Sequence, residues 1–131
     1  MSARRVAVFF YGMFMDADLL RAKGAGPANP RRASVRGLAL RIGQRAALVP
    51  DERGVAHGIV MDLAHDDIDR LYAEPSVSMY RPEAVLVDVE DGSSLPALCF
   101  NLPVPPRPEE ENAGYAEKLS ELKRRLGLPA A

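Results

Sequence analysis

The chain has 131 residues, with 17 Lys or Arg against 18 Asp or Glu, and its formal net charge is −1. This balance, together with 47% hydrophobic residues, is typical of a globular protein and excludes nucleic acid or an anionic membrane as the main partner. The length is sufficient for one hydrophobic core, so we expect a single domain over residues 1–131.

The first apolar segment runs from Val6 to Phe10 and stops at Tyr11–Gly12, and a short helix is expected over residues 16–23. The segment is far shorter than the ~20 residues that a membrane-spanning helix needs. No small-residue cleavage site follows it. We therefore expect the first core strand of a cytoplasmic protein that has no membrane partner. A buried strand that turns at a glycine into a helix exposes backbone N–H groups, which favours anion binding at this turn.

Residues 25–32 contain two prolines, a glycine and an asparagine, and are expected to form a loop. Three strands are then predicted, over residues 33–42, 45–49 and 55–63, with turns at 43–44 and 50–54. Gly37 and Gly58 lie inside these strands. Glycines at such positions indicate bulges and strong bending, as in a small barrel.

The second half of the chain predicts two more helices and a hairpin. A helix over 66–73 must end before Pro75, because the residue that precedes a proline is disfavoured in the α region. Residues 80–90 alternate as a strand, and residues 95–101 are its hairpin partner. Asn112 is expected to cap a last helix, whose apolar stripe packs either on the core or on a partner. The stripe consists of Tyr115, Leu119, Leu122 and Leu126. The fold class is therefore α+β, a small mixed, mainly antiparallel barrel flanked by helices.

Few standard catalytic motifs are found along the chain. A glycine-rich phosphate loop and a G-x-S-x-G elbow are both absent from the sequence. Cys99 is the only cysteine, and its apolar neighbours favour a buried small hydrophobe over a reactive thiol. His57 and His65 lack the spacing of a metal motif. The sequence therefore predicts no metal and no cofactor.

Glu74 is the side chain that we expect to carry chemistry. It lies at a helix end beside a proline, with apolar neighbours at Leu71, Tyr72 and Val77. A carboxylate in such surroundings is suited to general acid–base catalysis. The alternative is a glutamate that is simply solvated at the end of a helix.

Three segments together resemble the γ-glutamylcyclotransferase-like superfamily, including its avirulence-induced relatives in plants. The first is a strand that ends in a Tyr-Gly loop before a helix, matched by residues 10–14 and then Leu19–Leu20. The second is a glycine-containing strand (residues 58–60) followed by a helix of the pattern Leu/Ile-Asp-x-x-Glu. Residues 68–74 and Tyr80–Arg81 match that helix and the tyrosine that follows it. The third is a closing helix that ends in Gly-Leu-Pro, here residues 127–129.

This resemblance implies a cofactor-independent acyl-transfer enzyme with a small-molecule γ-glutamyl substrate. Such enzymes cyclise the γ-glutamyl group to 5-oxoproline and release the attached amine, because the α-amine attacks its own γ-carbonyl. Glu74 matches the catalytic glutamate, as general acid and base, and the resemblance implies that it lines one cavity with the Tyr-Gly loop. The substrate is expected to contact Tyr11, Gly12, Met13, Phe14, Arg45 and Tyr80. A monomer or homodimer is expected.

Two alternatives remain open at this point. Met13 and Phe14 stand where the family has smaller polar residues, which favours a binding module with weak or no activity on the same fold. Arg41 and Arg45 are candidates to bind a carboxylate on the leaving group, and structural salt bridges are the other interpretation.

Overall fold

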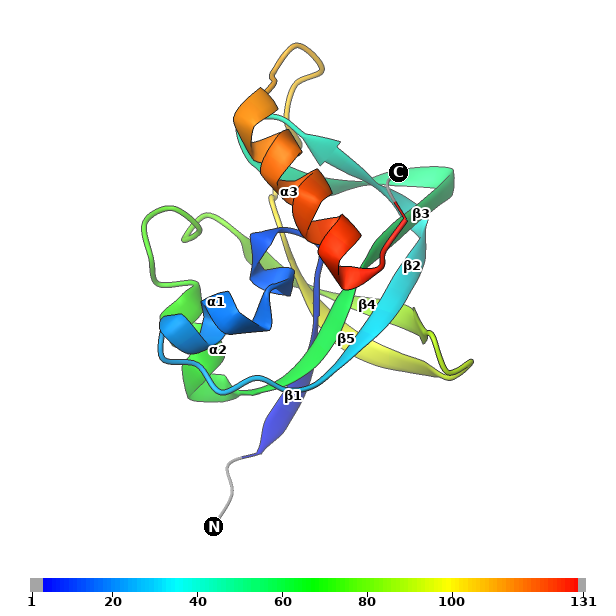
Figure 1. The fold of residues 1–131 in the computed structure, drawn as a ribbon. Helices are drawn as coiled ribbons and strands as arrows, with labels where there is room; N and C mark the ends of the chain where they lie inside the picture. The colour runs from blue at the N-terminus through cyan, green and yellow to red at the C-terminus, as the bar shows by residue number, and fades with distance from the viewer. Residues whose placement is uncertain (1–3, 130–131) are drawn as a thin grey trace.

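The structure is a computed structural model that describes residues 4–129. Five strands form a closed barrel in the order β1-β3-β2-β4-β5, with three α-helices and one 3-10 turn outside it (Figure 1). The elements in chain order are β1 Arg5–Phe10, η1 Met13–Met15, α1 Ala17–Ala22, β2 Ala28–Ile42, β3 Ala46–Ala64, α2 His65–Leu71, β4 Arg81–Val89, β5 Ser94–Asn101 and α3 Ala113–Leu126. The predicted α+β barrel is confirmed.

All neighbouring strands pair antiparallel except at one seam. There β1 and β5 run parallel, with Val8 opposite Leu98. The long β2–β3 pair is the largest part of the sheet, and β1 lies along the second half of β3, with Phe10 opposite Ile59. This register places the end of β1, where Phe10 is buried, beside the second half of the longest strand.

Two boundaries differ from those that the sequence predicts. The expected loop over residues 25–32 becomes strand at Ala28, because a register shift between Ala28 and Arg31, with Asn29 at φ 54°, accommodates Pro30 within the ladder. The expected turn at residues 50–54 lies within β3, which is one continuous strand.

The continuity of β3 depends on a bulge that it shares with β2. The register shifts between Arg36 and Leu38, with Gly37 at φ 88°, and residues 50–55 of β3 face this step. A Cβ on Gly54 would lie 2.7 Å from the carbonyl oxygen of Leu38. Both strands therefore bend together where the sequence suggested a hairpin tip.

The first two helices lie side by side on one side of the barrel (Figure 1). Asp16 caps α1 by accepting from the N–H of Asp18. Asp67 of α2 accepts from the N–H of Gly26, just after α1, at 2.9 Å. The loop after α1 and the start of α2 are therefore held near one another.

The last helix is capped as predicted, since the Asn112 side chain accepts from the N–H of Tyr115. Leu119 and Leu122 of its apolar stripe are buried at 1% exposure, and Tyr115 and Leu126 pack against the same cluster. The stripe therefore packs on the core. No helix within residues 4–129 is long and apolar enough to cross a membrane.

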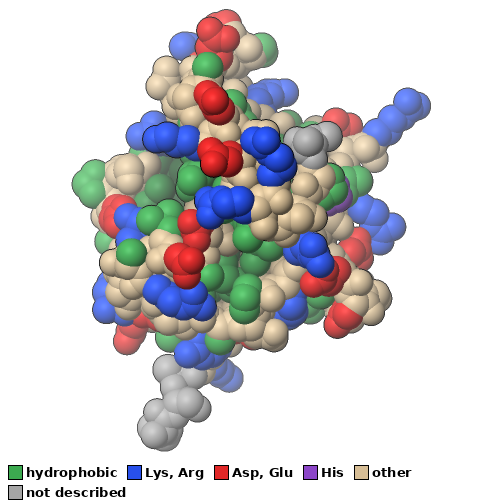
Figure 2. All heavy atoms as spheres, in the orientation of Figure 1, with side chains coloured by type: hydrophobic (Ala, Val, Ile, Leu, Met, Phe, Trp, Pro, Cys, Tyr) green, Lys and Arg blue, Asp and Glu red, His purple; other side chains and the backbone are tan. Residues whose placement is uncertain are grey.

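Acidic and basic side chains are interspersed over the face shown in Figure 2. Three arginines of β2 form ion pairs with acids on β3, on β4 or just after β4: Arg31–Asp62, Arg32–Glu90 and Arg36–Asp88. These pairs join β2 to its neighbours in the sheet.

Candidate functional site

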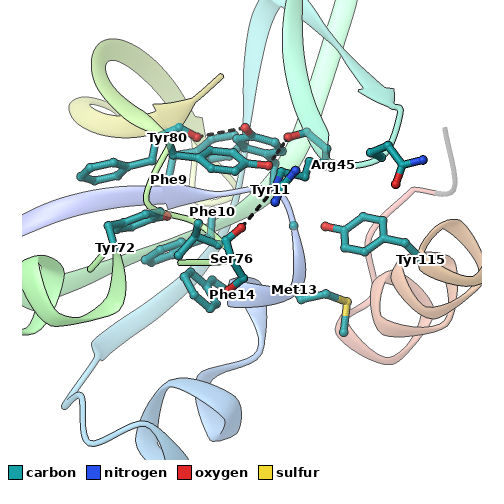
Figure 3. Close-up of a pocket in the computed structure, with 15 residues that line it drawn as sticks. Phe9, Phe10, Tyr11, Met13, Phe14, Arg45, Tyr72, Ser76, Tyr80 and Tyr115 are labelled. Carbon is teal, nitrogen blue, oxygen red and sulfur yellow. Dashed lines mark hydrogen bonds between the residues drawn. The ribbon is translucent and has the colours of Figure 1, made fainter. Parts of the chain in front are cut away.

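A cavity of about 390 Å3 opens where β1 ends (Figure 3). Its walls come from the Gly12 turn, the β2–β3 turn, the loop between α2 and β4, and the start of α3. This volume is within the range of small-molecule sites. The lining residues are Phe9, Phe10, Tyr11, Gly12, Met13, Phe14, Gln44, Arg45, Ala46, Tyr72, Ser76, Val77, Tyr80, Phe100 and Tyr115.

The cavity brings together most of the residues that the sequence predicts as a site. Those that line it are Tyr11, Gly12, Met13, Phe14, Arg45 and Tyr80. They come from three segments that are far apart in the sequence. Their contact with a ligand remains a prediction.

The Gly12 turn is shaped by two backbone hydrogen bonds between nearby residues and by its contact with α3. Met15 donates to the Gly12 carbonyl at 3.0 Å, and Asp16 donates to the Met13 carbonyl at 3.1 Å. A Cβ on residue 12 would lie 2.8 Å from the Tyr115 hydroxyl. Glycine therefore lets Tyr115 reach into the cavity from α3, opposite the other rings (Figure 3).

The β2–β3 turn that carries Arg45 is fixed from outside. Gly43 packs so closely that a Cβ there would lie 2.5 Å from the Pro106 Cβ. The adjacent Gln44 donates its N–H to Glu110 Oε1 at 3.3 Å. Arg45 Nε in turn donates to the Ser76 carbonyl at 3.2 Å, drawn dashed in Figure 3. This bond links the turn to the loop after α2 across the mouth of the cavity.

The structural-salt-bridge interpretation of Arg41 and Arg45 does not hold among residues 4–129. Both side chains donate to backbone carbonyls, Arg41 to Pro106 and Arg45 to Ser76. Neither forms an ion pair with a described residue. Of the residues that line the cavity, Arg45 alone has a charged side chain.

The tyrosine hydroxyls around the cavity are neutral near pH 7. Burial raises the pKa of Tyr80 to about 12, with a smaller rise from Tyr115 and an opposing effect of Arg45. Its hydroxyl donates to the Ala46 carbonyl. Burial also raises the pKa of Tyr72 and of Tyr115. These groups therefore act as hydrogen-bond donors and acceptors and not as anions.

Buried polar groups hold the floor of the cavity together. The Tyr11 hydroxyl donates to the Phe100 carbonyl at 2.9 Å. The Asn101 side chain accepts from the N–H of Leu48 at 2.9 Å and donates to its carbonyl at 2.8 Å. Because these bonds join β1, β3 and β5, the floor is a fixed surface.

Glu74 lies in the loop between α2 and β4 but does not line the cavity. Its carboxylate accepts from Lys23 Nζ at 2.8 and 3.0 Å, and the two side chains are 38% and 28% exposed. The expected placement of this carboxylate beside the Tyr-Gly turn is therefore not what the structure shows. The loop presents Tyr72, Ser76 and Val77 to the cavity and holds Glu74 against α1.

Tyr72 is one of the lining residues that the sequence did not predict as part of the site. Its ring stacks on Phe100 with the centroids 3.9 Å apart and an interplanar angle of 14°. The pattern Leu/Ile-Asp-x-x-Glu could have indicated this position. When Ile68 and Asp69 are its first two residues, its glutamate position is residue 72 and not residue 74. A tyrosine thus stands where that spacing would place the glutamate.

The remaining titratable candidates lie apart from this cavity. Cys99 is buried at 1% exposure, and burial raises the pKa of its thiol to about 12, so it is an inert core residue. His57 lies on β3 outside the cavity. In the described part of the chain, no three His, Cys, Asp or Glu side chains are arranged to hold a metal ion.

The family model described as "Gamma-glutamyl cyclotransferase, AIG2-like" matches residues 8–119. This range includes every residue of the cavity. No curated protein sequence matches the chain.

Solved structures share the fold at low sequence identity. A protein from Arabidopsis thaliana is 22% identical with a TM-score of 0.72, over 97% of this chain and 88% of that one. A structure named gamma-glutamyl cyclotransferase is 16% identical with a TM-score of 0.74, over 96% and 82%. An AIG2-like protein from Mus musculus is 17% identical with a TM-score of 0.64, over 85% and 90%. At these identities the likeness shows the fold.

Proposed function

Because the chain belongs to the gamma-glutamyl cyclotransferase, AIG2-like family, we propose that its cavity binds a small γ-glutamyl amide. In this proposal the α-carboxylate of the glutamyl unit lies beside Arg45 and the Gly12 turn, and the amide points toward the aromatic side chains that line the cavity. The observation that carries the proposal is the convergence of the predicted binding residues on one cavity whose single charged side chain is a cation.

The chemistry of the cavity mouth supports an anionic group at this place. The Arg45 guanidinium uses Nε for the Ser76 carbonyl, which leaves its outer N–H groups for a bidentate contact with a carboxylate. Gly12 lies outside the helices and strands, and its N–H donates to no backbone carbonyl among residues 4–129. Such a free donor at a turn favours an anion.

A titration of γ-glutamyl amides tests the binding proposal. We expect γ-glutamyl-ethylamide to bind, and the α-glutamyl isomer and the analogue without the α-carboxylate to bind more weakly. Arg45→Gln is expected to weaken binding about tenfold to a hundredfold, the effect of losing a charge-assisted hydrogen bond. Arg41→Gln is the matched control, because Arg41 lies on the same strand pair and does not line the cavity. Equal affinity in Arg45→Gln and Arg41→Gln would contradict the proposal.

Cyclisation of the bound amide is a second candidate function. The α-amine nitrogen would form a bond to the γ-carbonyl carbon, the bond to the leaving nitrogen would break, and the products would be 5-oxoproline and the free amine. A carboxylate is needed to take a proton from the attacking nitrogen and return one to the leaving nitrogen. Glu74 favours this candidate, since it lies two residues from Tyr72 and from Ser76, which both line the cavity.

The position of Glu74 is also what makes binding the better-supported function. Proton transfer requires hydrogen-bond reach of the substrate, and the Glu74 carboxylate is engaged with Lys23. Cyclisation therefore requires that this ion pair open and the loop turn its carboxylate inward.

Measurement of 5-oxoproline with the same amides separates the two functions. If Glu74 is the proton carrier, Glu74→Gln lowers turnover by about a hundredfold or more with binding unchanged, whereas the exposed Asp69→Asn does not. If the wild-type protein binds the amides and releases no 5-oxoproline, cyclisation is excluded and binding stands.

A further inference from the structure

All aromatic residues of the chain lie around this one cavity. The sequence contains four tyrosines, four phenylalanines and no tryptophan. Each of the eight lines the cavity: Phe9, Phe10, Tyr11, Phe14, Tyr72, Tyr80, Phe100 and Tyr115. Aromatic side chains usually serve the core of a whole domain, so their concentration at one place requires an explanation.

The eight rings form two layers with different exposure. The inner layer is core, because Phe9, Phe10, Tyr11 and Phe100 are all at most 9% exposed. The outer layer remains accessible from the cavity and consists of Phe14, Tyr72, Tyr80 and Tyr115, which are half-buried. Folding accounts for the inner layer, whereas the outer layer leaves ring surface free for a ligand.

Three of the outer rings, Phe14, Tyr72 and Tyr80, form one aromatic wall of the cavity, and Tyr115 lies opposite them (Figure 3). Tyr72 uses one face to stack on Phe100. Phe14 meets Tyr72 edge-on, with centroids 5.6 Å apart and an interplanar angle of 76°. Tyr80 flanks the same ring at 6.4 Å and 47°. Rings set at these different angles offer both faces and edges to an inserted group, which are the two contacts that aromatic pairs prefer.

The charges around the cavity select against a cation on this wall. Among residues 4–129 no Asp or Glu lines the cavity, and Arg45 is its one charged group. The α-ammonium of the glutamyl unit lies beside its own α-carboxylate, whereas a cation on the amine portion of the ligand would meet no carboxylate on the wall. The wall therefore suits an uncharged ring better than an ammonium group.

We infer that the group on the amide nitrogen of the ligand is aromatic, and that it packs against Phe14, Tyr72 and Tyr80 while the carboxylate faces Arg45. The inference rests on the proposed binding of a γ-glutamyl amide. It narrows the ligand class to γ-glutamyl derivatives of arylalkyl amines or of aromatic amino acids.

A matched series of γ-glutamyl amides tests the inference by calorimetric titration. The amine portions are ethylamine, 2-cyclohexylethylamine and 2-phenylethylamine. N-(2-phenylethyl)acetamide serves as the ligand without the glutamyl unit. We expect the phenylethyl amide to bind at least tenfold more tightly than the ethyl amide. It should bind about two- to tenfold more tightly than the cyclohexylethyl amide, which matches it in size but has no π face.

Variants of the wall give an internal control for folding. Phe14→Leu and Tyr72→Leu are expected to remove most of the phenylethyl preference, measured within each variant as the ratio of the affinities for the phenylethyl and ethyl amides. Loss of the affinity for both amides in Tyr72→Leu would indicate damage to the stack on Phe100. In that case the phenylethyl preference of Phe14→Leu decides whether the inference holds.

The outcomes separate this inference from the proposed function. Equal affinities across the three amides would overturn the aromatic preference and leave γ-glutamyl binding intact. Binding of the phenylethyl acetamide as tight as that of the γ-glutamyl series would support the aromatic wall and overturn the recognition of the glutamyl unit. If the phenylethyl amide does not bind at all, the inference is wrong.

Discussion

The loop between α2 and β4 has two sides with opposite chemistry. Its inner side presents Tyr72 and Tyr80 to the cavity, where Arg45 is the only charged lining group. Its outer side holds Glu74 in a partly exposed ion pair with Lys23 of the α1 C-terminus. A few residues of chain thus separate an aromatic wall from the carboxylate that the sequence suggested for catalysis.

This difference shows how a helix end assigns neighbouring residues to different surroundings. After α2 ends at Leu71 the backbone turns, with Val77 donating to the Glu74 carbonyl at 3.0 Å. Tyr72 gains contacts by stacking on the core, whereas a carboxylate on that side would lose its hydration. Lys23 offers Glu74 a partner outside. The inner side therefore offers apolar surface to the ligand that we propose, and the proposed proton transfer requires a rearrangement of the outer side.

The largest expected effect comes from a side chain at Gly58, where β3 packs closely against the end of β1 beneath the cavity. A Cβ on Gly58 of β3 would lie 2.1 Å from the Phe10 carbonyl oxygen and 2.9 Å from the Phe9 ring. Gly58→Val should lower the free energy of unfolding by about 3 kcal/mol or more, or prevent folding. Urea unfolding measures this effect. Gly114→Ala is the control, since its Cβ would meet nothing closer than 3.9 Å; a comparable loss there would refute the explanation.

The next effect concerns the polar floor of the cavity. Asn101 is 6% exposed and satisfies both the N–H and the carbonyl of Leu48. Asn101→Leu leaves these groups without partners, so we expect a loss of about 2–4 kcal/mol in unfolding free energy. Tyr11→Phe removes the hydroxyl that donates to the Phe100 carbonyl at 2.9 Å and to Asn101 Oδ1 at 3.3 Å, but it leaves the Leu48 groups paired and should cost about 1 kcal/mol. Equal stability of the two variants in chemical denaturation would contradict the structural role given to the Asn101 side chain.

Alkaline pH is expected to lower the free energy of unfolding through the buried Cys99 and Tyr80 on the inner side. The pKa values of Cys99 and Tyr80 are both raised to about 12, chiefly by burial. The folded protein keeps protons that the unfolded chain releases above pH 9 for the thiol and pH 10 for the phenol. The contribution of these groups to the free energy of unfolding is therefore fully present below those pH values and is lost as the pH rises toward 12. For the thiol the slope is on the order of 1.4 kcal/mol per pH unit.

Urea midpoints between pH 8 and 11, under reducing conditions, measure this slope. Cys99→Ala should flatten it between pH 9 and 10, where the thiol is the first of the two groups to contribute. An unchanged slope in that variant would show that the thiol is not the source.

The smallest effect is expected on the outer side of the loop. Lys23 and Glu74 are 28% and 38% exposed, and such pairs contribute about 0–1 kcal/mol. A double-mutant cycle with Lys23→Met and Glu74→Gln should give a coupling energy in this range that decreases in high salt. A coupling of several kcal/mol would mean that this side is as firmly built as the inner one.

Local patterns in the sequence predicted much of the fold. Alternation and capping identified β1, the β4–β5 hairpin and the Asn112-capped α3, because each depends on neighbouring residues. The sequence did not predict that β3 is continuous through residues 50–54. That outcome depends on the partner strand β2, which bulges at Gly37 opposite the same residues.

The candidate site divides in the same way. The sequence by itself identified the Gly12 turn, Arg45 and Tyr80, because turn glycines and pattern matches are local or nearly so. Tertiary structure alone decided that these residues share a cavity with every aromatic ring of the chain. It also decided that Glu74 contacts Lys23 outside that cavity. The physical reason is that the direction of a side chain in a loop is set by what packs against the loop, and Phe100 and Lys23 are distant in sequence from the residues that they hold.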